Sequence, residues 1–160
     1  MTETCKLAAN YIIKKTNKFN SGQKFADQIL ITCKRLQKLL YFSDIEFMKR
    51  NNGNSMYTEE YYAWPSGPVI PSVYYEFLQY QNGEVCPLKD GSDNMLTLEM
   101  VDAIDYVLNQ TNGIDTVELI AFSHIAGGPW SRFYTDNDPN HEQLIPKSII
   151  YSFYKNRNIF

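Results

Sequence analysis

The feature that most constrains this chain is a proline-rich run, Trp64-Pro65-Ser66-Gly67-Pro68-Val69-Ile70-Pro71. Three prolines in seven residues each fix φ at about −65° and remove a backbone donor, and Gly67 permits a backbone conformation closed to other residues. The run therefore predicts a stiff corner, with a turn at Ser66-Gly67-Pro68 and a helix beginning at Pro71. Trp64 is large enough to fix this corner to a core, and the Trp64–Pro65 bond could be cis or trans.

Around this corner, the spacing of apolar residues predicts a mainly α fold of about six helices packed as one compact domain. A short extended or β element is expected near residues 56–64, where Tyr, Thr and Trp gather before Pro65. Residues 84–94 read as a loop, with one short strand around Val85. The six helices are expected over residues 4–15, 33–50, 71–82, 98–112, 116–125 and 146–156.

The helix expected over 33–50 has the clearest pattern. Thr32 can cap its first turn, and Asn51-Asn52-Gly53 ends it. Cys33 occupies a core position on its apolar side, where cysteine behaves as a small hydrophobe. The charged residues are placed on the opposite, solvated side: Lys34, Lys38, Glu46 and Lys49.

Composition narrows the class of protein. A chain of 160 residues with 44% hydrophobic residues fits a single globular domain over 1–160. The net charge of −3 and the short basic clusters, read as solvated helix faces, do not predict nucleic-acid binding. Three scattered cysteines do not predict a disulfide framework or a zinc site. Without a signal peptide or a long apolar run, the expected location is cytoplasmic, with no membrane contact.

No set of residues predicts catalysis, a metal site or a cofactor. His124 could act as a base, but Ser123 beside it points to another face of the helix. For a metal, His141 and nearby loop acids (Asp136, Asp138 and Glu142) match no standard spacing. We expect His124 to bond backbone groups freed where its helix breaks at Gly127-Gly128. Contact with a partner and a role in a small hydrolase are the alternatives.

Four segments, taken in order, resemble the Panacea domain family. Residues 35–42 are similar to its "KLQKLLYY" helix, and residues 63–74 to its "AW-x-x-GPV-x-P-x-x-Y" corner. Ser123-His124 and Pro129-Trp130 are similar to its "TH-x-x-x-PW" segment, with one extra residue. A terminal helix pattern is matched by Ile145, Ile150 and Phe153. The resemblance spans about residues 25–155, and Ser66 departs from it where many members carry an aromatic residue.

The resemblance implies an antitoxin-like, phage- or prophage-associated protein that is not an enzyme. Its expected partner is a protein toxin encoded nearby, which it neutralises by direct binding or by delivery to a protease. The alternatives are a small hydrolase or nucleic-acid-processing enzyme that uses His124, and a DNA-binding regulator. The residues expected to contact a partner are those of the family segments: Tyr41, Trp64, Gly67, Pro68, Val69, Tyr74, His124 and Trp130.

Overall fold

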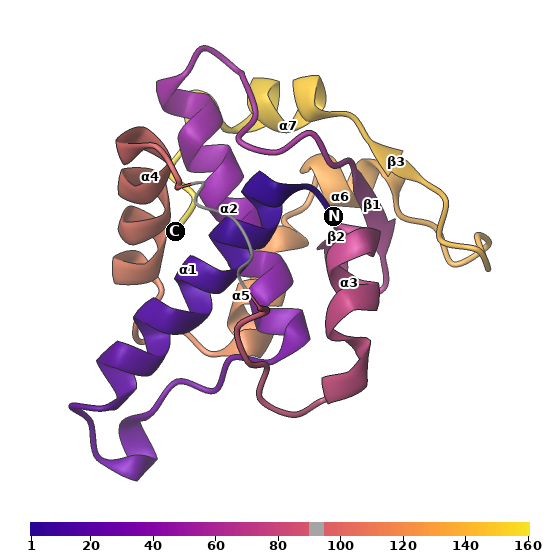
Figure 1. Ribbon diagram of the computed structural model, residues 1–160. Helices are drawn as coiled ribbons and strands as arrows, with labels where there is room; N and C mark the ends of the chain where they lie inside the picture. Colours follow the sequence, from indigo (N-terminus) through magenta and orange to yellow (C-terminus); the bar gives the residue numbers. More distant parts are fainter. Residues whose placement is uncertain (90–94) are drawn as a thin grey trace.

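The structure is a computed structural model that describes residues 1–89 and 95–160 (Figure 1). The mainly α fold predicted from the sequence is confirmed. In the described ranges the α-helices are α1 Glu3–Asn20, α2 Cys33–Arg50, α3 Pro71–Phe77, α4 Leu98–Gln110, α5 Thr116–Ser123, α6 Pro129–Phe133 and α7 Lys147–Tyr154. Two 3-10 helices, Phe25–Asp27 and Leu78–Tyr80, and three short strands complete the regular structure of these ranges.

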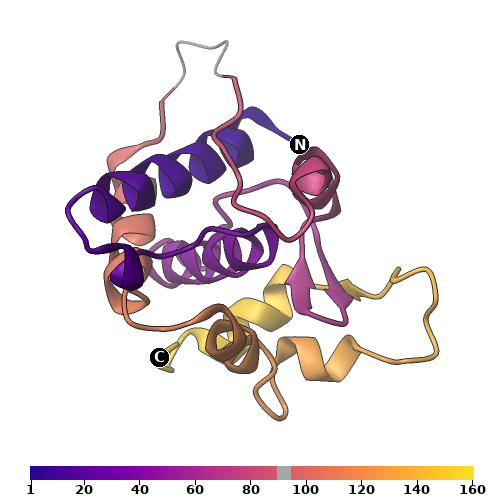
Figure 2. The same cartoon turned by 90° about the horizontal axis from the view of Figure 1, so that it is seen from below.

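Helix α2 forms the centre of the molecule, and α1, α3, α4, α5, α7 and the hairpin pack around it (Figures 1 and 2). The bounds of α2 agree with the prediction. As predicted, Thr32 caps its first turn, where the Thr32 hydroxyl accepts from the Arg35 N–H. Cys33 is buried, as predicted. A helix surrounded on all sides must bury residues all round, which a single apolar stripe does not reveal.

The solvated face predicted for α2 is wrong in its central part. Lys34 is exposed, but Lys38 is fully buried, and Arg35 and Glu46 are buried as well. The Arg35 guanidinium donates to the carbonyl oxygens of Ile114 and Thr111, beyond the end of α4. Glu46 forms ion pairs within α2 itself, with Lys49 and Arg50. Each buried charge thus has a local or distant polar partner, as burial requires.

The proline-rich run forms a β-hairpin rather than a single corner. Strand β1 (Tyr61–Trp64) pairs antiparallel with β2 (Gly67–Val69), and β1 also pairs with β3 (Leu144–Ile145), giving the order β2-β1-β3. The turn is Pro65-Ser66, so the predicted turn at Ser66-Gly67-Pro68 is displaced by one residue. Proline suits the first position of such a turn, and a glycine with positive φ commonly follows it; Gly67 has φ +98°. The Trp64–Pro65 bond is trans.

A buried carboxylate holds the segment that leads from α2 to the hairpin. Asp44 accepts from the Met56 N–H, the Ser55 hydroxyl and the Tyr61 hydroxyl, at 2.6 to 3.0 Å. Burial raises the pKa of Asp44 to about 6, although these three donors act to lower it. The contacts fix β1 against the middle of α2.

Elsewhere the predicted helix starts are confirmed at Thr97 and Asp115, whose side chains accept from Met100 N–H and Glu118 N–H. Helix α1 is longer than predicted, and the short helix α6 and strand β3 were missed because each has too few residues to show a period. The predicted strand around Val85 is reduced to one bridge between Thr32 and Glu84. Positions 90–94 of the predicted loop lie outside the described residues.

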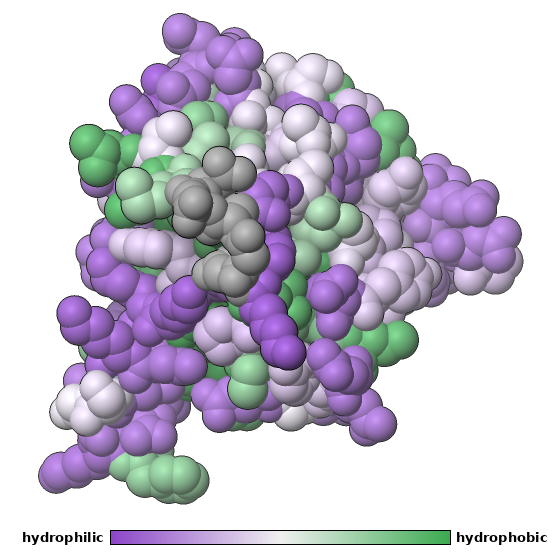
Figure 3. All heavy atoms as spheres, in the orientation of Figure 1, coloured by the Kyte–Doolittle hydropathy of each residue, from purple (hydrophilic) through white to green (hydrophobic). Residues whose placement is uncertain are grey.

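On the face seen in Figure 3, hydrophobic residues form small separate groups among hydrophilic ones, outside the area that grey atoms cover. Among the described residues, no helix has both the length and the apolar character needed to cross a membrane.

Candidate functional site

The hairpin is attached to α2 by two adjacent polar side chains. The Gln37 carboxamide bonds both backbone groups of Ile70: its Nε2 donates to the carbonyl oxygen (3.1 Å), and its Oε1 accepts from the N–H (2.9 Å). The Lys38 amine donates to the carbonyl oxygen of Pro68. Two residues of α2 thereby hold the backbone of β2 and of the residue that follows it.

Gly67 allows the hairpin to approach α2 and α5 this closely. A Cβ at this position would lie 2.5 Å from the Ser123 hydroxyl and 2.8 Å from Lys38 Nζ. Its φ of +98° is also one that residues with a side chain rarely adopt. Both the contact and the backbone conformation therefore require glycine here.

A second tryptophan fastens the hairpin from the C-terminal side. The indole N–H of Trp130, in α6, donates to the carbonyl oxygen of Trp64 at 2.8 Å. The His124 ring stacks on Trp130 with centroids 3.5 Å apart and an interplanar angle of 7°. Tyr134 also stacks on Trp130, at 4.5 Å. Residues far apart in the sequence thus form one cluster around the hairpin.

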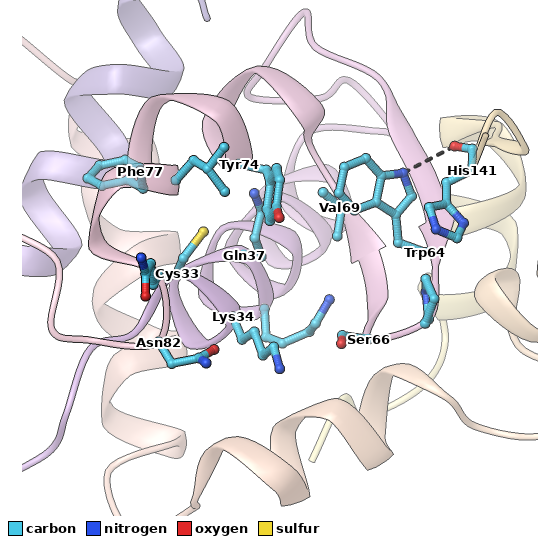
Figure 4. A pocket seen from close by; sticks show the side chains of 14 residues that line it. Cys33, Lys34, Gln37, Trp64, Ser66, Val69, Tyr74, Phe77, Asn82 and His141 are labelled. Atoms are coloured by element: carbon cyan, nitrogen blue, oxygen red, sulfur yellow. Dashed lines mark hydrogen bonds between the residues drawn. The ribbon is translucent and has the colours of Figure 1, made fainter. Parts of the chain in front are cut away.

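Trp64 lies half-buried on the hairpin, facing α3 and the segment before β3. Its indole N–H donates to the carbonyl oxygen of His141 at 3.1 Å, and its ring meets Tyr74 edge-to-face at 4.9 Å (Figure 4). His141 has φ +54°, a conformation uncommon for a residue other than glycine. The strained loop residue therefore places its carbonyl where it fixes the Trp64 ring.

Trp64 forms one end of a groove of about 460 Å³ between α2, the hairpin and α3. Figure 4 shows Trp64 and Ser66 at one end, Cys33 and Asn82 at the other, and Lys34 between them. The volume lies in the range of roughly 300–1,000 Å³ that is usual for ligand sites. The remaining residues that line it are Gln37, Lys38, Pro65, Val69, Tyr74, Phe77, Leu78, Gln81 and His141.

Burial changes the acid–base properties of two groups in this region. It lowers the pKa of Lys38 to about 7, because the amine is removed from water and has no carboxylate partner among the described residues. The pKa of His124 is lowered too, first by burial and then by the nearby charge of Lys38. Both groups therefore favour their neutral forms more than free side chains do.

Comparison with known proteins identifies the family. The model of the family described as "Antitoxin SocA-like, Panacea domain" matches residues 36–131. The chain belongs to this SocA-like Panacea family. Over 105 residues the chain is 30% identical to Antitoxin SocA of Caulobacter vibrioides (strain NA1000 / CB15N). The aligned region covers 59% of this chain and 55% of that protein. The chain thus spans about half the length of this curated relative. No solved structure matches it.

The family segments recognised in the sequence meet in space in this Panacea domain. Gln37 and Lys38 come from the first segment, the hairpin is the second, and Ser123, His124 and Trp130 belong to the third. Of the residues expected to contact a partner, the half-buried ones are Trp64, Tyr74, His124 and Trp130. Tyr41, Gly67, Pro68 and Val69 are buried and support the surface from beneath.

The prediction that the His124 side chain bonds backbone groups freed at Gly127-Gly128 is wrong. Its Nε2 is buried and has no hydrogen-bond partner within the described ranges. The ring is instead stacked on Trp130. Two of the loop acids considered for a metal site have other partners: Asp136 accepts from the Tyr134 hydroxyl, and Asp138 from the Gln143 N–H. In residues 1–89 and 95–160, no group of three His, Cys, Asp or Glu side chains could hold a metal ion.

Sequence reasoning missed Gln37, Lys34 and Lys38 as members of the site. Lys38 lies directly between Gln37 and Leu39 in a run with Leu36 and Leu40, all buried. A charged residue enclosed by core positions was the available signal, but amphipathic patterning assigns charge to solvent by default.

Proposed function

We propose that this chain is an antitoxin that binds a protein toxin encoded near its own gene and prevents the toxin from acting. The match of residues 36–131 to the SocA-like antitoxin family carries this proposal, because that range contains the hairpin together with Gln37, Lys38 and Trp130, which bond its backbone. The gene is expected in a phage or prophage setting, and the protein is expected to act in the cytoplasm.

The geometry around the hairpin favours recognition of a protein. Trp64 and Tyr74 are half-buried, and their rings are held by contacts with each other and with His141. Aromatic side chains fixed in this way lose little conformational entropy on binding, and they are frequent among residues that dominate interface energies. The buried partners beneath them, among them Gln37 and Lys38, keep the backbone in place.

Neutralisation has two possible routes, direct inhibition and delivery to a protease, and one experiment tests both. Each neighbouring gene is placed under an inducible promoter, with or without this chain, and colony counts are taken after induction. We expect one neighbour to be toxic alone and harmless when co-expressed. If no neighbour is toxic, or if toxicity persists beside the soluble chain, the antitoxin proposal is contradicted.

The half-life of the toxin then separates the routes. Under direct inhibition the toxin persists in a stable complex, whereas delivery shortens its half-life in a host with intact proteases and not in a protease-deficient host. The matched control for both assays is Lys155→Gln, which changes an exposed residue at the end of α7 that does not line the groove beside Trp64.

A further inference from the structure

The groove beside the hairpin has two unlike sides (Figure 4). Its aromatic side is formed by Phe77, Tyr74 and Trp64. Its polar side includes Asn82, Lys34 and Ser66. A ligand that fills the groove therefore has to present apolar surface to one side and hydrogen-bonding groups to the other.

The polar side can donate hydrogen bonds to a ligand. The side chains of Lys34, Ser66 and Asn82 form no hydrogen bond or ion pair with another described residue. An ammonium group is only a donor, and a hydroxyl or a carboxamide can donate as well as accept. No residue that lines the groove is an aspartate or glutamate. The groove therefore suits a ligand that offers acceptors.

Neutral acceptors fit this groove better than carboxylates do. The Lys38 amine is fully buried and bonded to the carbonyl oxygen of Pro68, so a ligand cannot reach it. Lys34 is then the one accessible cation of the groove, and it is exposed to water, where a single ion pair contributes little. Backbone carbonyl oxygens are the neutral acceptors that a partner protein has in greatest number.

The aromatic side presents its rings at steep angles to one another. Trp64 and Tyr74 meet edge-to-face, with centroids 4.9 Å apart and an interplanar angle of 68°. Tyr75 continues this surface beyond the groove: it is 64% exposed, and its ring meets Tyr74 at 5.5 Å and 75°. Rings arranged in this way leave notches instead of one flat face. A notch suits a compact ring such as that of proline better than a planar base, which stacks on a parallel face.

Both ends of the groove contain a residue with an uncommon backbone conformation. His141, beside Trp64, has φ +54°, and Gln81, next to Asn82 in the sequence, has φ +49°. In residues 1–89 and 95–160, Asn52 is the only other non-glycine residue with a positive φ. Such conformations cost free energy and gather at ligand-binding sites. Their occurrence at both ends supports a binding role for the groove.

We propose that this groove binds an extended, proline-rich segment of the partner protein, with proline rings against the aromatic side and backbone carbonyl oxygens toward the polar side. A polyproline II segment has no internal hydrogen bonds, and proline has no backbone N–H, so the segment offers mainly acceptors. Because it is already extended, it loses little conformational entropy on binding to an aromatic-lined groove. The proposal deepens the proposed function, since it rests on the partner being a protein toxin.

The two tryptophans of the chain provide a direct test. Trp64 lines the groove, whereas Trp130 lies outside its lining. In ¹⁵N-labelled protein, the two indole N–H signals are followed while N-acetylated, C-amidated hexaproline is added. The matched probe is a hexapeptide of alternating glycine and serine, which is also uncharged but is flexible and keeps its N–H groups. We expect hexaproline to shift the Trp64 signal more than the Trp130 signal, and to bind at least about threefold more tightly than the matched probe.

Substitutions test the two sides of the groove separately. Tyr74→Leu removes a ring from the aromatic side and should weaken hexaproline binding at least about threefold. Lys34→Glu replaces a donor by an acceptor that repels carbonyl oxygens, and it should weaken binding by a similar factor. Lys34→Gln keeps a donor and should bind like the wild type, as should Lys155→Glu at the exposed end of α7. Because Lys34 is exposed, Lys34→Glu decides the test even if Tyr74→Leu does not fold.

Several results would overturn the proposal. These are equal affinity for the two peptides, no shift at Trp64, or wild-type binding by Lys34→Glu. Tighter binding of adenosine or of a glutamate-serine hexapeptide than of hexaproline would indicate a planar or an acidic ligand instead. A Trp64 signal that changes when the free chain is concentrated would indicate that a second copy occupies the groove.

The outcome is separable from that of the antitoxin proposal. If the wild-type chain and Lys34→Glu protect cells equally and hexaproline does not bind, the antitoxin function stands and the groove has no part in it. If no neighbouring gene is toxic, the antitoxin proposal fails, but the peptide titration still decides whether the groove recognises a proline-rich segment.

Discussion

The buried amine of Lys38 donates a hydrogen bond to the carbonyl oxygen of Pro68, thirty residues further along the chain, and so joins the central helix to the hairpin. The interaction leaves a lysine in the core without a carboxylate partner among the described residues. Burial accordingly lowers the pKa of Lys38 to about 7. Because the unfolded chain exposes this amine, its burial makes the stability of the fold sensitive to pH.

Stability should rise with pH above neutrality because of Lys38. The unfolded chain keeps this amine protonated up to about pH 10.4, so between pH 7 and that value it binds more protons than the folded chain. The free energy of unfolding should therefore increase by roughly 1–2 kcal/mol between pH 7 and 8.5 from this group. Urea denaturation of the wild type and of Lys38→Met measures the difference. Parallel pH dependence of the two proteins would show that Lys38 is not the source.

Gly67→Ala should destabilise the fold by about 2–4 kcal/mol, because its Cβ would meet the Ser123 hydroxyl and Lys38 Nζ at a positive φ. The matched control is Gly113→Ala, where an added Cβ has no neighbour within 4 Å and φ is not positive. Chemical denaturation of both variants checks the prediction. A loss at Gly67 no larger than the change at Gly113 would mean that the hairpin does not pack on α2 and α5 as described.

Substitution of Trp130 should mainly lower stability, whereas substitution of Trp64 should mainly weaken partner binding. Trp130→Phe removes the hydrogen bond to the Trp64 carbonyl and should lower the free energy of unfolding by about 1–3 kcal/mol. Trp64→Phe leaves that bond in place, so we expect it to cost less than about 1 kcal/mol in stability and to weaken partner binding. Thermal unfolding together with a binding assay tests the pair, and the reverse order of effects would contradict the assignment.

His124 should make the fold less stable in acid. Because its folded pKa is lowered, the unfolded chain binds more protons below about pH 6.5, and stability is lost as the pH falls through that range. His124→Phe keeps a ring that can stack on Trp130 and removes the titration. We expect the variant to lose less stability than the wild type between pH 7 and 5.5 in denaturation experiments. A larger acid-induced loss in the variant would exclude this role for His124.

The parts of the fold that follow from local chemistry could be predicted from the sequence. Thr32, Thr97 and Asp115 cap their helices within three residues, and Pro71 begins a helix by its own fixed φ. The extended element before the prolines was predicted as well, although its pairing with β3, more than eighty residues away, was not.

The site was harder to predict because its contacts join distant segments. Lys38 was assigned to solvent, since nothing near it in the sequence shows that its amine will bond the carbonyl oxygen of Pro68. The stacking of His124 on Trp130 depends on how the chain reverses at Gly127-Gly128, which residue spacing does not determine. The resemblance to the Panacea family did single out residues 35–42, 63–74 and 123–130, which the structure shows in contact around the hairpin.

The affinity of the purified chain for its toxin, measured by isothermal titration calorimetry, tests the central claim most directly. We predict a saturable complex with the wild type and at least about tenfold weaker binding for Trp64→Ala, because fixed aromatic residues commonly dominate such interfaces. Lys155→Gln should bind like the wild type. No detectable complex with a toxin that the chain neutralises in cells, or unchanged affinity in Trp64→Ala, would contradict neutralisation by direct binding at the hairpin.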